Sequence, residues 1–130
     1  MKILLGVIAG AVVAILCIFG VEALGHMVFP PPPGTDFTDP AQVARLMEIV
    51  PTGALAFVLA AWFVGAFAGA WVADAVAKRA IAGWIVALLV IAGGVFTMSM
   101  IPHPVWMWAA GIALPLIAAW LAQRFAKVAM

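Results

Sequence analysis

The sequence predicts an all-α integral membrane protein, a single domain over residues 1–130 that forms a four-helix bundle of up-down-up-down topology. Hydrophobic residues make up 68% of the chain and charged residues 8%, and the mean hydropathy is +1.28. A globule of this size has too little interior to hide so much apolar surface from water, whereas a bilayer accommodates it. Four apolar stretches are long enough to cross about 30 Å of hydrocarbon as helices. The predicted spans cover about residues 3–29, 51–73, 80–101 and 105–122.

Basic residues predict the orientation of these spans. Five of the six Lys and Arg residues fall on one side of the predicted membrane, whereas Arg45 and four of the five acidic residues fall on the other. Lys and Arg in short loops favour the cytoplasmic side. We therefore expect both termini to lie in the cytoplasm. The five residues on that side are Lys2, Lys78, Arg79, Arg124 and Lys127.

The first span carries small residues at a helical spacing, Gly6, Gly10 and Ala14, which would let another helix approach closely. Its apolar core is longer than that of a cleaved signal peptide, so we expect it to be retained as a helix. Consecutive prolines at 30–33 end it and favour a stiff extended exit. The single cysteine, Cys17, excludes an internal disulfide and is expected to be a small packing residue.

The outer loop, residues 30–50, contains the signature of a short amphipathic helix. Asp39 followed by Pro40 is typical of an N-cap and a first helical position. Apolar residues then recur at the spacing of one helix face, at Val43, Leu46, Met47 and Val50. Such a helix either lies in the outer membrane interface or covers the end of the bundle.

The second span holds the strongest packing motif in the chain. Small residues repeat every four positions, at Ala61, Gly65, Gly69 and Ala73. This pattern is typical of a close helix–helix contact in a membrane, although it also arises by chance in an alanine-rich sequence. We interpret it as a helix-packing stripe.

The third span follows the second after a short turn, so the two are expected to be antiparallel neighbours. Asp74 and Lys78 are one helical turn apart and can pair at the cytoplasmic end. The fourth span begins after a proline-bounded turn that contains His103 and is predicted to kink at Pro115. Trp62 falls near the middle of the membrane, where we expect it to pack in the bundle rather than line a site.

The candidate site lies on the predicted outer side. Glu22 and His26 are four residues apart and share a helix face, and His103 is placed on the same side. A carboxylate at that depth needs a partner, water or the bundle interior. Glu22, His26 and His103 are an acceptable first shell for zinc, and five nearby methionines would suit copper(I). The alternatives are a structural polar network, haem held between the two histidines, and proton or cation exchange through Glu22.

The sequence favours a non-enzymatic function. It contains no Ser/His/Asp set, no HExxH motif and no phosphate-binding loop. A net charge of +1 excludes a nucleic-acid-binding patch. The first hypothesis is a protein that works through helix packing in the lipid bilayer, as a homo-oligomer or as an accessory subunit of a membrane complex. The second is zinc or copper binding or handling, or cation- or proton-coupled transport, at the Glu22/His26/His103 cluster.

Four segments together carry a resemblance to a class of known proteins. The segments VEALGH, PPPPG, WFVGAFAGAW and IPHPVW resemble, in combination, small four-span proteins of bacterial inner membranes that have no assigned activity. The resemblance covers most of the chain. It implies the same membrane location and helix number, and it implies no functional residue.

Overall fold

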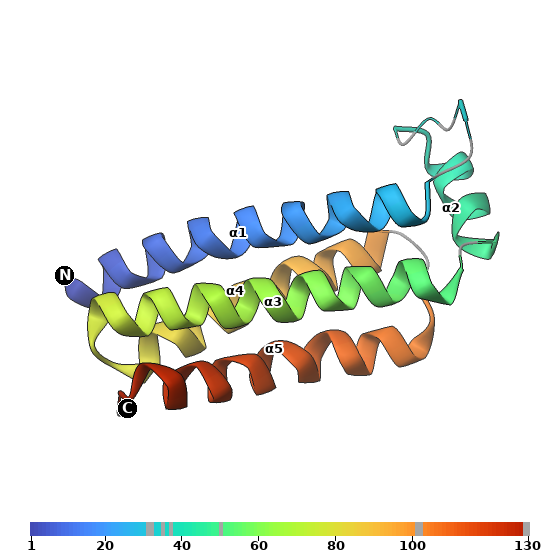
Figure 1. The fold of residues 1–130 in the computed structure, drawn as a ribbon. Helices are drawn as coiled ribbons and strands as arrows, with labels where there is room; N and C mark the ends of the chain where they lie inside the picture. Colours follow the sequence, from blue (N-terminus) through green and yellow to red (C-terminus); the bar gives the residue numbers. More distant parts are fainter. Residues whose placement is uncertain (31–32, 35, 37, 50, 101–102, 129–130) are drawn as a thin grey trace.

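A computed structural model of the chain describes residues 1–30, 33–34, 36, 38–49, 51–100 and 103–128. All regular secondary structure within these residues is helical, which confirms the predicted all-α class (Figure 1). Four of the five helices are long and apolar enough to cross a membrane. The five helices are α1 (Lys2–Val28), α2 (Pro40–Ile49), α3 (Thr52–Ala77), α4 (Ala80–Met100) and α5 (Val105–Ala126).

Two of the long helices continue further than their apolar stretches predict. The helix α3 ends at Ala77 rather than at residue 73, and α5 ends at Ala126 rather than at residue 122. Each helix runs on through polar residues and stops where the next residue, Lys78 or Lys127, adopts a left-handed backbone conformation. The end of the apolar stretch shows where the first polar side chain occurs, whereas the helix itself ends at its C-cap residue.

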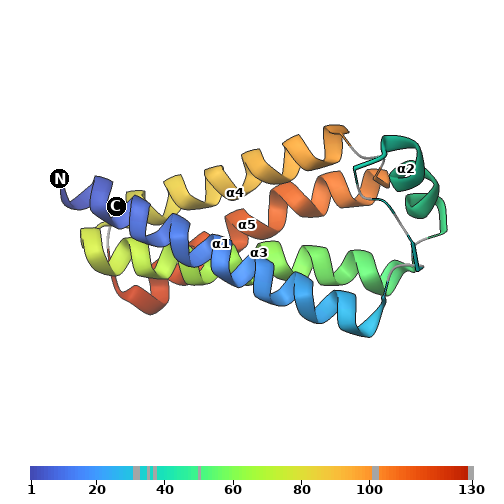
Figure 2. The same ribbon diagram turned by 90° about the horizontal axis from the view of Figure 1, so that it is seen from above.

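The long helices lie side by side, with both chain termini at one end of the bundle and α2 at the other (Figures 1 and 2). The helix α3 is the hub, because it contacts α1, α4 and α5. The helix α1 contacts α3 and α4. Figure 2 shows that α1 and α4 lie close together near the termini and diverge toward the end that carries α2.

The contact between α1 and α3 is a seam of small residues in the half of the bundle near the termini. A methyl group added at Gly69 would lie 2.6 Å from the carbonyl oxygen of Gly10, and one added at Gly6 would lie 2.6 Å from that of Ala73. Side chains at these positions would force the backbones apart. The predicted stripe at Ala61, Gly65, Gly69 and Ala73 is buried, and its glycines face α1 of the same chain.

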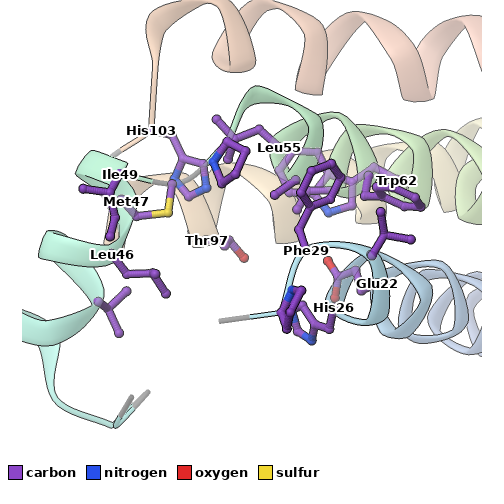
Figure 3. A pocket seen from close by; sticks show the side chains of 18 residues that line it. Glu22, His26, Phe29, Leu46, Met47, Ile49, Leu55, Trp62, Thr97 and His103 are labelled. Atoms are coloured by element: carbon purple, nitrogen blue, oxygen red, sulfur yellow. The ribbon is translucent and has the colours of Figure 1, made fainter. Parts of the chain in front are cut away.

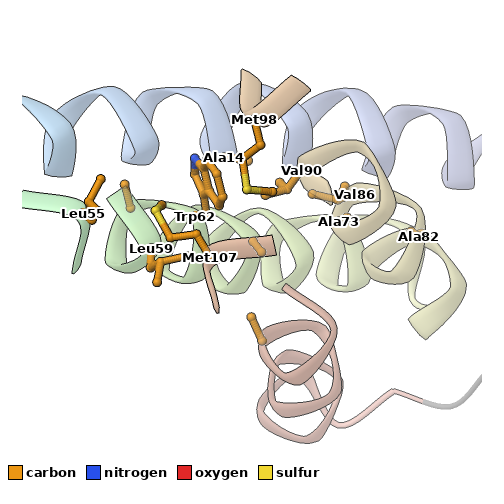
Figure 4. Packing of buried hydrophobic residues seen from close by; sticks show 14 residues of the cluster. Ala14, Leu55, Leu59, Trp62, Ala73, Ala82, Val86, Val90, Met98 and Met107 are labelled. Carbon is orange, nitrogen blue, oxygen red and sulfur yellow. The ribbon is translucent and has the colours of Figure 1, made fainter. Parts of the chain in front are cut away.

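The hydrophobic core of the bundle combines alanines with larger side chains, several of which lie around Trp62 (Figure 4). The indole is only 6% exposed and lies against two glycines, Gly94 of α4 and Gly111 of α5, which leave room for the ring. Met98 and Met107 are buried in the same cluster. Trp62 therefore reaches from α3 to both α4 and α5 and packs against each of them.

The turn between α3 and α4 is held by Asp74, in a way that the sequence prediction missed. Asp74 is fully buried, and its Oδ1 accepts a hydrogen bond from the backbone N–H of Gly83 at 2.7 Å. Oδ2 is also buried and has no hydrogen-bond partner among the described residues. Lys78 is exposed. The pairing with Lys78 that the sequence allows is absent among the described residues, because the carboxylate points toward the first turn of α4, where free N–H groups attract negative charge.

Further polar and aromatic contacts close the same end of the bundle. The indole N–H of Trp84 in α4 donates a hydrogen bond to the side-chain oxygen of Gln123 in α5 at 2.9 Å. Phe67 and Trp71 of α3 pack with Phe125 of α5, with ring centroids 5.7 to 6.1 Å apart. The ends of α3, α4 and α5 are therefore linked pairwise near the termini.

The helix α2 begins where the sequence predicts. Oδ1 of Asp39 accepts a hydrogen bond from the N–H of Ala41 at 3.0 Å, and Pro40 is the first helical residue. Just before it, hydrogen bonds from the hydroxyl and the N–H of Thr38 hold the pKa of Asp36 below its ordinary value. The predicted extended exit at residues 30–33 and the apolar position Val50 fall wholly or partly outside the described residues.

Candidate functional site

A cavity of about 550 Å³ lies at the end of the bundle opposite the termini (Figure 3). It is lined by side chains of α1, α2, α3 and α4 and by His103 just before α5. Most of the lining is apolar. Among the described residues, the polar side chains in it are Glu22, His26, Thr97 and His103. The three residues that the sequence predicts as a cluster thus all line one cavity.

Glu22 and His26 form the polar edge of the cavity on α1. Glu22 is half-buried and His26, one turn later, is exposed. The two side chains share a helix face, and the described part of the chain contains no direct hydrogen bond between them. Gly25 lies between them on the buried side, where an added methyl group would touch Phe57 of α3 at 2.9 Å. This contact places the carboxylate beside the apolar wall that α3 provides.

His103 and Thr97 reach the cavity from other elements. His103 is half-buried and precedes Pro104, the N-cap residue of α5. Figure 3 places His103 on the side of α2, apart from Glu22 and His26 on α1. The Thr97 hydroxyl donates a hydrogen bond to the carbonyl oxygen of Gly93 at 2.9 Å, so its proton is already used. The polar groups therefore surround the cavity rather than converge on one point.

The predicted metal shell receives no support from this arrangement. No three His, Cys, Asp or Glu side chains among the described residues form a group that could hold a metal ion. Glu22, His26 and His103 share a cavity, and their assignment as zinc or copper ligands stays a prediction.

The methionines that the sequence suggests as copper ligands do not lie together either. Only Met47 lines the cavity. Met98 and Met107 are 4% and 0% exposed and pack in the hydrophobic core, and Met27 and Met100 are on the surface. Methionine is used here as a flexible filler of irregular apolar space.

Aromatic rings form the inner wall and the floor of the cavity. Phe29 at the end of α1 and Phe57 of α3 meet edge to face, with ring centroids 6.0 Å apart and an interplanar angle of 67°. Trp62 lines the deep end. We expected Trp62 to pack in the bundle rather than line a site, and it does both. No spacing in the sequence distinguishes a core tryptophan from one whose edge faces a cavity.

The helix α2 forms the remaining wall without packing its backbone on the bundle. Among the described residues, no Cα atom of α2 lies within 8 Å of one in another helix. Val43 is buried, and Leu46 and Met47 are half-buried and point into the cavity, whereas Arg45 and Glu48 are exposed. The helix thus stands off from the bundle, and its side chains cross the gap.

Comparison with known proteins gives no assignment. The chain matches no protein-family model, no curated protein and no solved structure. What the cavity binds therefore has to be inferred from its own residues.

Proposed function

We propose that the chain is an integral protein of the bacterial inner membrane that binds a small, largely apolar molecule in the cavity beneath α2. Its four long helices cross the bilayer in an up-down-up-down arrangement with both termini in the cytoplasm, and α2 lies in the outer interface. The observation that carries the proposal is the cavity of about 550 Å³, walled by apolar and aromatic side chains with a few polar groups at its edge. Ligand pockets in proteins have this size and this composition.

The location of the cavity supports this function. It lies at the end that the basic residues predict to be outside, between helices that diverge there. A molecule dissolved in the outer leaflet would reach it without crossing the membrane. A cavity of this size between packed helices also forgoes contacts that would stabilise a solid core, which favours a role in binding.

A function based on helix packing alone has less support. The small-residue stripe that suggested a homo-oligomer is occupied by α1 of the same chain, at Gly65 and Gly69. It is therefore not available to a second copy. Association with itself or with another membrane subunit stays a prediction that rests on no described contact.

Filling the cavity tests the binding function. Ala54 lines the cavity, and Ala60 on the same helix is exposed outside it. We expect the uncharged hydrocarbon triphenylmethane to bind the wild-type protein and Ala60→Trp in lipid nanodiscs, and to bind Ala54→Trp at least about tenfold more weakly. Equilibrium dialysis, with the uptake of empty nanodiscs subtracted, measures the difference. Equal binding to all three proteins, or to none, would contradict the proposal.

Cysteine labelling tests the orientation. In a Cys17→Ala background, an impermeant thiol reagent added to intact spheroplasts should label Thr38→Cys and not Lys2→Cys. Both positions are exposed. Labelling of Lys2→Cys alone would invert the orientation and place the cavity on the cytoplasmic side.

Elemental analysis tests the metal alternative. We expect the protein, purified gently in detergent without a chelator, to contain neither zinc nor copper in stoichiometric amount. If the wild-type protein contained one equivalent of either metal and Glu22→Gln contained none, the cavity would be a metal site rather than a site for an apolar molecule.

A further inference from the structure

The described part of the cavity lining contains an acidic side chain and no permanently charged basic one. Among the described residues that line it, Glu22 is the only acidic side chain, and no lysine or arginine is present. The two histidines are neutral when unprotonated, so the cavity then carries no positive charge to balance an ionised carboxylate. A half-buried carboxylate in a membrane helix has lost part of its hydration. A cation or hydrogen-bond donors must take the place of the water to offset that loss of free energy. The cavity therefore favours a positively charged occupant over an anion.

The aromatic side chains favour the same kind of occupant. Phe29, Phe57 and Trp62 line the cavity, and the edge-to-face contact between the two phenylalanines holds their planes at 67° to one another. The faces of aromatic rings attract cations, most strongly where water is excluded. Trp62 is only 6% exposed, so the half-buried Phe29 and Phe57 provide most of the ring surface open to a cation.

We propose that the cavity selects lipophilic organic cations, in which an ammonium or similar cationic group is joined to an apolar body. The cationic group lies beside Glu22, and the apolar body packs against the aromatic wall and the side chains of α2. This assignment rests on the proposed binding function and narrows it to one class of ligand.

The amine headgroup of a phospholipid offers the same chemistry, and the cavity lining favours a free cation instead. A phospholipid carries a phosphate next to its amine, and the described part of the lining provides no lysine or arginine to neutralise that phosphate. The carboxylate of Glu22 would repel it. The occupant is accordingly a free organic cation.

Two ions of nearly equal size and shape test the selectivity without any substitution. We expect tetraphenylphosphonium to bind the wild-type protein in nanodiscs of phosphatidylcholine at least about tenfold more tightly than tetraphenylborate, a difference of about 1.4 kcal/mol. Equilibrium dialysis measures both. Equal binding, or tighter binding of the anion, would overturn the proposal.

A matched pair of substitutions assigns the selectivity to Glu22. Glu22→Gln keeps the shape of the side chain and removes its charge, and it should weaken binding of tetraphenylphosphonium about tenfold. Glu48→Gln removes the same charge from the exposed side of α2, outside the cavity, and should leave binding unchanged. Equal effects of the two variants would mean that the cation responds to the general negative charge of the outer surface, which would overturn the role of the cavity.

Two further measurements separate the outcomes. If triphenylmethane binds and tetraphenylphosphonium binds no more tightly, the ligand class is wrong and the binding function stands, whereas failure of both probes removes both. If phosphatidylethanolamine in the nanodiscs abolishes binding of tetraphenylphosphonium, a lipid amine occupies the cavity and the assignment to a free cation is overturned.

Discussion

The two ends of this bundle are built from different kinds of residue. Near the termini, α1 and α3 meet through glycine and alanine, and the helix ends are linked by Asp74 to Gly83 and by Trp84 to Gln123. At the other end, the facing side chains are large, α2 stands off from the bundle, and a cavity of about 550 Å³ remains. The polar side chains at the first end form hydrogen bonds between helices, Asp74 to a backbone N–H and Trp84 to Gln123, whereas those at the second end surround a cavity.

This difference shows how one small bundle of apolar helices combines a closely packed end with a cavity. Lipid is as apolar as the side chains, so helices associate through close contact and hydrogen bonds rather than through hydrophobic burial. Small residues provide the contact at the end near the termini, the closed end. At the opposite end, the open end, aromatic residues such as Phe57 and Trp62 line a cavity. The closed end therefore carries the stability that the open end gives up.

The largest expected effect breaks the closed end at its seam. In Gly69→Leu, the new side chain would begin 2.6 Å from the carbonyl oxygen of Gly10, so α1 and α3 must separate. We expect the free energy of unfolding to fall by about 3 kcal/mol. SDS-induced unfolding in mixed micelles measures it. The control is Gly93→Leu in α4, where an added methyl group meets nothing within 4 Å, and similar stability of the two variants would remove the seam from this account.

The next effect concerns the buried carboxylate at the α3–α4 turn. Asp74→Ala leaves the N–H of Gly83 without an acceptor, and we expect a loss of about 2 kcal/mol in the free energy of unfolding. Asp74→Asn keeps an oxygen at the same place and should lose less. The same unfolding assay compares them. If asparagine were as harmful as alanine, the charge of Asp74 rather than its hydrogen bond would hold the turn.

A smaller effect is expected where α4 and α5 are joined. Trp84→Phe removes the N–H that donates to Gln123, and we expect a loss of about 1 kcal/mol. Combining Trp84→Phe with Gln123→Ala should cost less than the sum of the single changes, because both remove one interaction. Strict additivity in this double-mutant cycle would mean that the hydrogen bond contributes nothing to stability.

The smallest effect on stability is expected at the open end. Leu46 projects from α2 into the cavity, where few atoms pack against it, so Leu46→Ala should lower the free energy of unfolding by less than about 1 kcal/mol. Leu59 is 8% exposed in the core, and Leu59→Ala should cost about 3 kcal/mol. Equal losses would show that α2 is part of the packed core and that the two ends differ less than described.

The sequence predicts most of the fold because its strongest signals are local. Apolar length identifies the four long helices, and Asp39 with Pro40 places the start of α2 correctly. The helix ends at Ala77 and Ala126 differ from the prediction, because a helix stops at its cap rather than where hydropathy falls. Local signals also assigned Asp74 to its neighbour Lys78, one turn away.

The site was harder to predict because it depends on contacts between distant segments. The sequence places Glu22, His26 and His103 on one side, and all three do line one cavity. It contains no signal for the space between them, because a cavity arises from the divergence of α1 and α4 and the stand-off of α2. For the same reason Trp62, whose role depends on glycines in two other helices, was not recognised as a cavity residue.

The seam between α1 and α3 also sets an order for biogenesis. Ribosomes deliver a chain from its N-terminal side, so α1 enters the bilayer before α3 has been made. During that interval Gly10 faces lipid, and Glu22 lacks the wall that α3 later provides. The helix α1 must therefore be stable in the membrane alone, which fits the fact that it contains the most apolar 18-residue stretch of the four long helices. Its carboxylate enters the membrane before the cavity around it exists.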